Sequence, residues 1–195
     1  PTSISVVMSR AEARSASNSA RLLSLWLPDV QLHVRGGDDD LRDPEALATR
    51  PGSALLFPSG GAPLPLPGDV HHLIVPDGTW AQARRIERRW FAPLALPRVA
   101  LSGPWPSAYG LRRGRDGLCT FEAVAIALGL LHDPTLAATL LHRFSDWERR
   151  ARHLKGGTPA LPASTSSPPA PHPAIALLNA APKAPSAVTP NTRPE

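Results

Sequence analysis

Cysteine is almost missing from this chain, with Cys119 the single one among 195 residues. One thiol excludes a disulfide framework, and it excludes a zinc site built from several thiolates within these residues. The histidines show no metal-ligand spacing, because the adjacent His71 and His72 would point to opposite faces of a strand. We therefore expect no bound metal and a reducing, cytoplasmic environment.

Long apolar runs are missing as well. No stretch approaches the roughly 20 apolar residues that a helix needs to cross a bilayer. A charged segment followed by a short apolar segment, the mark of a signal peptide, does not occur at the start. We expect no membrane partner. The chain begins at Pro1 without an initiator methionine, so we expect an N-terminal part to precede it.

Positive charge is concentrated in the second half of the sequence. The formal net charge is +5. Residues 77–155 carry 13 Lys and Arg against 7 Asp and Glu, whereas residues 1–76 carry 6 against 8. Such an asymmetry favours a polyanionic partner, and nucleic acid in particular.

Short apolar runs alternate with helical patterns as far as residue 155. This alternation predicts an α/β fold, with a mainly parallel sheet and helices on both faces. The expected strands are Ser3–Met8, Val30–Val34, Ala54–Phe57, His72–Val75 and Arg98–Leu101. The expected helices are Ala20–Leu27, a short one from Asp43 to about Thr49, Thr79–Trp90, Thr120–His132 and one from Pro134 to about Leu154.

The composition changes after residue 155. Residues 156–195 hold ten of the 24 prolines and only three charged side chains. Such a segment buries too little apolar area to offset the entropy of ordering it. We predict one domain over residues 1–155 and a disordered low-complexity tail over residues 156–195.

The segment Asp77-Gly78-Thr79-Trp80 joins an apolar run to an arginine-rich helix. An acidic side chain at the carboxyl end of a parallel strand lies where open α/β sheets bind ligands. Asp77 could cap the following helix, or it could orient or deprotonate a reacting group. Thr79 could equally be the cap, which would leave Asp77 for chemistry.

The helix predicted over residues 79–90 has an apolar face and an arginine face. Arginines at four-residue spacing repel each other by a few tenths of a kcal/mol per pair, and only Glu87 is present to relieve them. We favour contact with phosphates over an ordinary solvated face. The residues expected to face the core are Trp80, Ala83, Ile86 and Trp90, and the candidate RNA contacts are Arg84, Arg85 and Arg88.

A long segment rich in Gly, Pro and Arg, residues 103–120, precedes the next helix. Trp105 and Tyr109 could stack on a base of single-stranded RNA, with Arg112 adding charge. Cys119 and the residues after it begin a helix, whose N-terminus can hold an anion. Glu122 in the first turn either serves the site or only complements the helix dipole. No histidine is placed by sequence to activate Cys119, so we disfavour a nucleophilic cysteine.

These motifs resemble the DTW-domain family, which is named for an Asp-x-Thr-Trp signature. The chain departs from the family pattern in two places: Cys119 replaces a serine, and Ser9-Arg10 stands where a His-Pro pair is usual. The resemblance extends from about Ser3 to about His153. The matching residues are Asp77, Thr79 and Trp80, then Ser107, Tyr109 and Arg112, and then Thr120, Glu122 and Ala123.

The resemblance implies a tRNA-uridine aminocarboxypropyltransferase. Such enzymes move the 3-amino-3-carboxypropyl group of S-adenosylmethionine to N3 of a uridine in tRNA. The implied fold is related to the SPOUT group and carries a C-terminal knot. The implied catalytic residues are Asp77, Thr79 and Trp80, and the candidates for binding the cofactor are Pro58, Ser59, Gly78, Leu118, Cys119, Thr120 and Glu122.

In this reaction we expect Asp77 to accept the N3–H hydrogen bond of the uridine as attack begins. We expect Arg112, or the helix end at Thr120, to hold the carboxylate of the cofactor. Two alternatives stay open: a SPOUT-type RNA methyltransferase and a non-catalytic RNA-binding module. The sequence does not specify the uridine, the tRNA or the oligomeric state.

Overall fold

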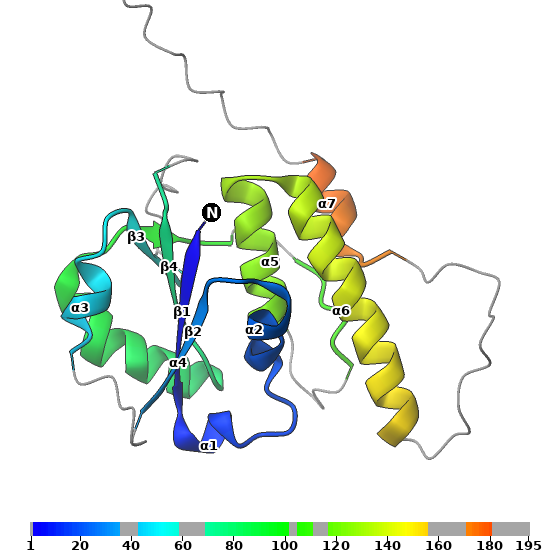
Figure 1. Ribbon diagram of the computed structural model, residues 1–195, viewed down its shortest axis with the longest axis horizontal. Coiled ribbons are helices and arrows are strands. Elements are labelled where there is room, and N and C mark those ends of the chain that lie inside the picture. The colour runs from blue at the N-terminus through cyan, green and yellow to red at the C-terminus, as the bar shows by residue number, and fades with distance from the viewer. Residues whose placement is uncertain are drawn as a thin grey trace, which may run out of the picture.

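The computed structural model describes residues 2–35, 43–58, 69–101, 105–110, 117–155 and 171–180. Within these residues the chain forms an α/β fold around a five-stranded sheet, in which each strand pairs in parallel with its neighbours (Figure 1). The strand order is β2-β1-β4-β3-β5. The strands are β1 (Ser3–Ser9), β2 (Val30–Arg35), β3 (Ser53–Leu56), β4 (His72–Pro76) and β5 (Arg98–Val99).

The central strands are buried on both faces. In β1 the successive residues Val6 and Val7 are both fully buried, although they point to opposite sides of the sheet. A sheet covered on both sides explains why its strands read as apolar runs rather than as alternating patterns. The five predicted strands are confirmed, with differences only at their ends.

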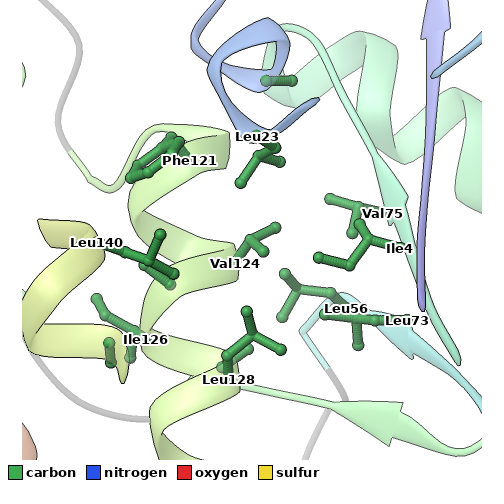
Figure 2. Close-up of a cluster of buried hydrophobic side chains, with 14 of the residues drawn as sticks. Ile4, Leu23, Leu56, Leu73, Val75, Phe121, Val124, Ile126, Leu128 and Leu140 are labelled. Atoms are coloured by element: carbon green, nitrogen blue, oxygen red, sulfur yellow. The ribbon is translucent and has the colours of Figure 1, made fainter. Parts of the chain in front are cut away.

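Helices cover the two faces of the sheet. On one face Val7, Leu55 and Ile74 pack against Leu47 and Ile86. Figure 2 shows the opposite face, where sheet residues meet the apolar helix α5 and the neighbouring helices. The helices are α1 (Arg10–Ala13), η1 (Ser19–Leu22), α2 (Leu23–Trp26), α3 (Glu45–Ala48), α4 (Trp80–Ile86), the π-helical η2 (Glu87–Phe91), η3 (Ala92–Leu94), α5 (Thr120–Leu131), α6 (Pro134–Lys155) and α7 (Ala174–Ala180).

The arginine-rich helix differs from its predicted form. Trp80 is 59% exposed, so the prediction that it faces the core is wrong. It is the first residue of α4, which begins shortly after the end of β4. The helix then continues as the π-helical η2, whose wider turn changes which side chains face inward. Phe91 is buried, whereas Trp90 is half-buried under the Arg35 guanidinium, which lies 4.1 Å from its ring centroid.

Part of the predicted disordered tail is ordered. Residues 171–180 include α7, which packs against α5 and α6 with Ala174 and Leu178 buried. Gly129 of α5 makes room for it, since a Cβ there would lie 2.6 Å from Ala137 Cβ and 3.0 Å from Leu178 Cδ2. The prediction of disorder is therefore wrong for this segment, because its short helix buries apolar side chains against α5 and α6. The other tail residues lie outside the described residues, and the C-terminal knot stays a prediction.

Among the described residues, no helix combines the length and apolar character that crossing a bilayer requires.

Candidate functional site

A cavity of about 290 Å³ opens at the carboxyl edge of the sheet. The ends of β3, β4 and β5 form its floor, and the first turns of α4 and α5 form walls. Aromatic side chains, among them Phe57 and Trp105, contribute to its lining. Six of the predicted site residues line it: Pro58, Gly78, Trp80, Leu118, Cys119 and Thr120.

Asp77 is 4% exposed and does not itself line the cavity, but its chain neighbours Pro76 and Gly78 do. Its backbone N–H donates to the Val7 carbonyl at 2.8 Å, which continues the sheet pairing one residue beyond β4. Its carboxylate accepts hydrogen bonds from Asn18 Nδ2, at 2.8 Å, and from the Thr120 hydroxyl. The carboxylate is therefore fixed beside Thr120 rather than turned toward bulk solvent.

Asn18 is a site residue that the sequence analysis missed as such. Its Oδ1 accepts from the backbone N–H of Arg21 and so caps η1, while its Nδ2 donates to Asp77. A cap signal before an apolar helix predicts only the first of these contacts. The second joins residues 59 positions apart and depends on the tertiary fold.

Thr79, and not Asp77, caps the arginine-rich helix. Its hydroxyl accepts from the Gln82 N–H at 3.3 Å, and its own N–H donates to Gln82 Oε1 at 2.7 Å. The sequence left two candidates for this cap, Asp77 and Thr79. Because Thr79 is the cap, Asp77 can make other contacts. The described contact of the Thr79 hydroxyl belongs to the cap. A catalytic role for Thr79 stays a prediction.

Gly78 has a φ of 137°, a conformation that side chains other than glycine rarely adopt. A Cβ at this position would lie 2.7 Å from Gln82 Oε1, so it would also disturb the capping box. The glycine therefore permits the sharp turn from the strand end into α4. This turn keeps Asp77 and the start of the helix beside the same cavity.

Glu122 lies behind the cavity wall with no exposed surface. Its Oε2 accepts from the Ser107 hydroxyl at 2.7 Å and from the Cys119 N–H at 2.8 Å. Its Oε1 accepts from the Ala108 N–H at 2.7 Å and from His172 Nε2 at 2.9 Å. Burial on its own would raise the pKa of Glu122, but these hydrogen bonds together hold that pKa below its ordinary value.

Glu122 has no exposed surface and does not line the cavity, so its predicted contact with the cofactor stays a prediction that the geometry does not support. All its described partners belong to the chain itself, and the side chain does not reach the cavity. A buried carboxylate needs several donors to remain charged. Three segments supply them here: residues 107–108, Cys119 and His172. Glu122 thus holds the segments of Ala108 and Cys119 together from outside the cavity.

Cys119 is buried at the N-cap of α5. Burial, together with the nearby charge of Glu122, raises the pKa of its thiol well above the ordinary range. The protonated thiol is a poor nucleophile at neutral pH. The structure therefore agrees with the sequence analysis, which disfavoured a nucleophilic cysteine.

Two comparisons with known proteins find a match. The family model of the DTW domain matches residues 1–151. The chain belongs to the DTW-domain family. No curated protein matches it. Among solved structures, the chain is similar to the SAM-dependent rRNA:acp-transferase Tsr3 from Vulcanisaeta distributa. The two are 20% identical with a TM-score of 0.50, and the match covers 80% of this chain and 81% of that one.

In this member of the DTW-domain family, the three signature segments are joined by direct hydrogen bonds. Thr120 of the third segment donates to Asp77 of the first. Ser107 of the second donates to Glu122 of the third. Residues far apart in the sequence thus form one connected polar network behind and beside the cavity.

Tyr109 of the second signature segment does not have the predicted RNA-stacking geometry. The side chain is 5% exposed and packs near Phe144 and Trp147, with ring centroids 5.5 and 6.2 Å away. Its hydroxyl donates to the Ser17 carbonyl at 2.8 Å. The ring instead holds its segment against the core, and contact of Tyr109 with RNA stays a prediction. Trp105, Trp80 and Phe57 are the aromatic residues that line the cavity.

The exposed arginines of this DTW-domain protein stand on the outer side of α4 and η2. Arg84, Arg85 and Arg88 are exposed, as predicted, and their contact with RNA stays a prediction. Glu87 does not relieve their repulsion, because its carboxylate is half of an ion pair with Arg98. Ser59 and Arg112 lie outside the described residues.

Within the part of the chain that the structure describes, no group of three or more His, Cys, Asp or Glu side chains is arranged to hold a metal ion.

Proposed function

We propose that this protein transfers the 3-amino-3-carboxypropyl group of S-adenosylmethionine to N3 of a uridine in tRNA. The observation that carries the proposal is the position of Asp77, buried at a strand end beside a cavity and bonded to the helix end at Thr120. Membership of the DTW-domain family supports it. The fold shared with Tsr3, a SAM-dependent rRNA:acp-transferase, supports it as well. A cytoplasmic location and the C-terminal knot belong to the same proposal.

The cavity suits S-adenosylmethionine in size and chemistry. About 290 Å³ lies just below the range, roughly 300–1,000 Å³, that small-molecule sites occupy. Apolar and aromatic walls suit an adenine ring and a thioether carbon chain. The N-terminus of α5, which begins at Thr120, suits the carboxylate of the amino-acid part. Arg112 is the other candidate to hold that carboxylate.

The sulfonium of S-adenosylmethionine makes the neighbouring γ-carbon electrophilic. In the proposed transfer, a bond forms between uridine N3 and this carbon, the carbon–sulfur bond breaks, and the sulfur keeps the electron pair. The proton of N3 leaves toward the Asp77 carboxylate, which Asn18 and Thr120 hold in place. The protein's main task is to orient the γ-carbon, rather than the methyl group, toward N3.

The RNA would approach over the outer side of α4. Exposed Arg84, Arg85 and Arg88 can donate to phosphates. Trp80 lines the cavity, is 59% exposed and stands edge-on to Phe57. An exposed indole at the mouth of a site can stack on an extruded base.

The direct test is incubation with S-adenosylmethionine labelled in its carboxyl group, and separately in its methyl group. The RNA arms are unmodified tRNA and unmodified rRNA, because the matched Tsr3 structure is that of an rRNA:acp-transferase. Carboxyl label in a tRNA nucleoside supports the proposal, and carboxyl label only in rRNA corrects the substrate. Methyl label in either RNA would identify a methyltransferase. Binding of RNA with no label transferred would identify a binding module.

Replacing the key carboxylate tests its role. We expect Asp77→Asn to lower turnover by about 100-fold, because the amide cannot take the N3 proton. Asp69→Asn, at an exposed acid before β4, is the matched control and should keep wild-type turnover. Wild-type turnover by the Asp77 variant would show that another group handles the proton.

A further inference from the structure

The buried pair His172–Glu122 joins the C-terminal segment to the centre of the site. His172 lies beyond residue 151, where the match to the DTW domain ends. Both side chains have no exposed surface, and His172 Nε2 is 2.9 Å from Glu122 Oε1. The neighbouring α7 packs against α5 and α6, beside the first part of α6 (Figure 1). A segment outside the family match therefore contacts a residue inside it.

The hydrogen bonds of His172 assign its protons. The backbone N–H of Ala174 donates to Nδ1 at 3.1 Å. Nδ1 therefore accepts with its lone pair and carries no hydrogen. The hydrogen of the neutral ring is then on Nε2, which donates to Glu122. His172 thus acts as a neutral donor to a buried carboxylate, with its ring fixed by the backbone of Ala174.

The bond from His172 stabilises a carboxylate that orders two cavity segments. Oε1 of Glu122, to which His172 donates, also receives the Ala108 N–H, from the segment that includes Trp105. Oε2 receives the Cys119 N–H at the start of α5. The next residue, Thr120, donates to Asp77. A continuous chain of hydrogen bonds and one peptide link connects His172 to the reacting edge of the cavity.

We propose that His172 is a positioning residue of the transferase, and that residues 171–180 are part of its working unit. By donating to Glu122, His172 keeps the carboxylate oriented toward both cavity segments. It therefore acts on S-adenosylmethionine binding through Glu122 and without touching the substrate. This inference rests on the proposed function for its effect on substrate, but its structural part can be tested without any ligand.

The test compares three variants of the full chain. His172→Leu removes the donor and keeps an apolar side chain in place. His172→Gln keeps an N–H that can reach Glu122. Leu177→Ser changes a partly exposed residue of α7, 41% exposed, and serves as the control. Thermal melts first establish a temperature at which every variant is folded.

The first readout is hydrogen exchange of the backbone amides of Ala108 and Cys119, measured without ligand. We expect exchange at both amides to be at least about tenfold faster in His172→Leu, because their shared acceptor loses its orientation. Exchange in the centre of β1 should stay at the wild-type rate. His172→Gln and Leu177→Ser should both resemble wild type. Equal exchange in all four proteins would overturn the positioning role.

The second readout is the affinity for S-adenosylmethionine by calorimetry, together with KM and kcat. We expect His172→Leu to raise the Kd and KM by about tenfold, which is the effect of one lost hydrogen bond to a charged group. His172→Gln should recover most of this loss. If wild type itself binds no S-adenosylmethionine, the proposed function fails, and the exchange data still decide the role of His172. Wild-type affinity in His172→Leu would overturn its link to the substrate.

Discussion

Lowering the pH from about 7 to about 5 should destabilise this protein by roughly 2 kcal/mol through His72 alone. The side chain is 1% exposed between β1 and β3. The Ser53 hydroxyl donates to the Leu47 carbonyl, so it accepts from His72 Nδ1 at 2.9 Å. The other ring nitrogen, Nε2, is then free to accept from the Ser5 hydroxyl at 2.9 Å. This buried network holds a neutral imidazole.

Burial is the main cause that lowers the pKa of His72 to about 4, and the charge of Arg50 adds to it. In the unfolded chain the pKa is near 6.5. Between these values the unfolded state binds a proton that the folded state does not, so stability falls as the pH falls. The slope is about 1.4 kcal/mol per pH unit, which gives roughly 2 kcal/mol at about pH 5 and the full loss only below pH 4.

Urea unfolding at several pH values, on wild type and His72→Gln, measures this contribution. The glutamine can bond to both serine hydroxyls but does not titrate. Wild type should therefore lose roughly 2 kcal/mol more than the variant between about pH 7 and about pH 5. Titrations at other residues occur in both proteins and cancel. His71→Gln, at the exposed neighbour, should keep the wild-type profile. Parallel profiles for wild type and His72→Gln would refute the reasoning.

Three further predictions concern the cavity and its rim. Thr120→Val should lower turnover about tenfold through loss of the bond to Asp77, and Thr120→Ser should restore it. Replacing Arg84 and Arg88 by Ala should reduce the slope of log affinity for RNA against log salt by about 1.4, whereas replacing two exposed arginines of α6 should not. Gly78→Ala should cost about 1–3 kcal/mol in urea unfolding, and more than Gly117→Ala, where φ is 90° but the space for a Cβ is open.

The strands were predictable because burial leaves a simple trace in the sequence. A strand covered on both faces, such as β1 or β4, is mostly apolar, and its few buried polar residues, such as Ser5 and His72, bond to each other. The place of Asp77 followed from the same reasoning, since a polar residue directly after such a run stands at the sheet edge. The cap at Thr79 was a local alternative that the structure selected.

Contacts between distant residues were not predictable in this way. The burial of Tyr109 depends on Phe144 and Trp147 of α6, which pack on it only in the folded chain. The outward position of Trp80 depends on where the helix meets the sheet edge. Periodicity alone treats such a helix as regular, so it also misses the π-helical turn that buries Phe91.

The sequence alone determined the parallel α/β architecture, the acidic residue at a strand end and the basic helix beside it, because each is written in neighbouring residues. Only the tertiary structure decided that Asp77 bonds to Asn18 and Thr120, and that His172 completes the partners of Glu122. These contacts close long loops, and local propensity carries no information about which distant groups meet. A buried carboxylate is stable only where the fold brings donors to it, so its partners emerge with the packing of the whole chain.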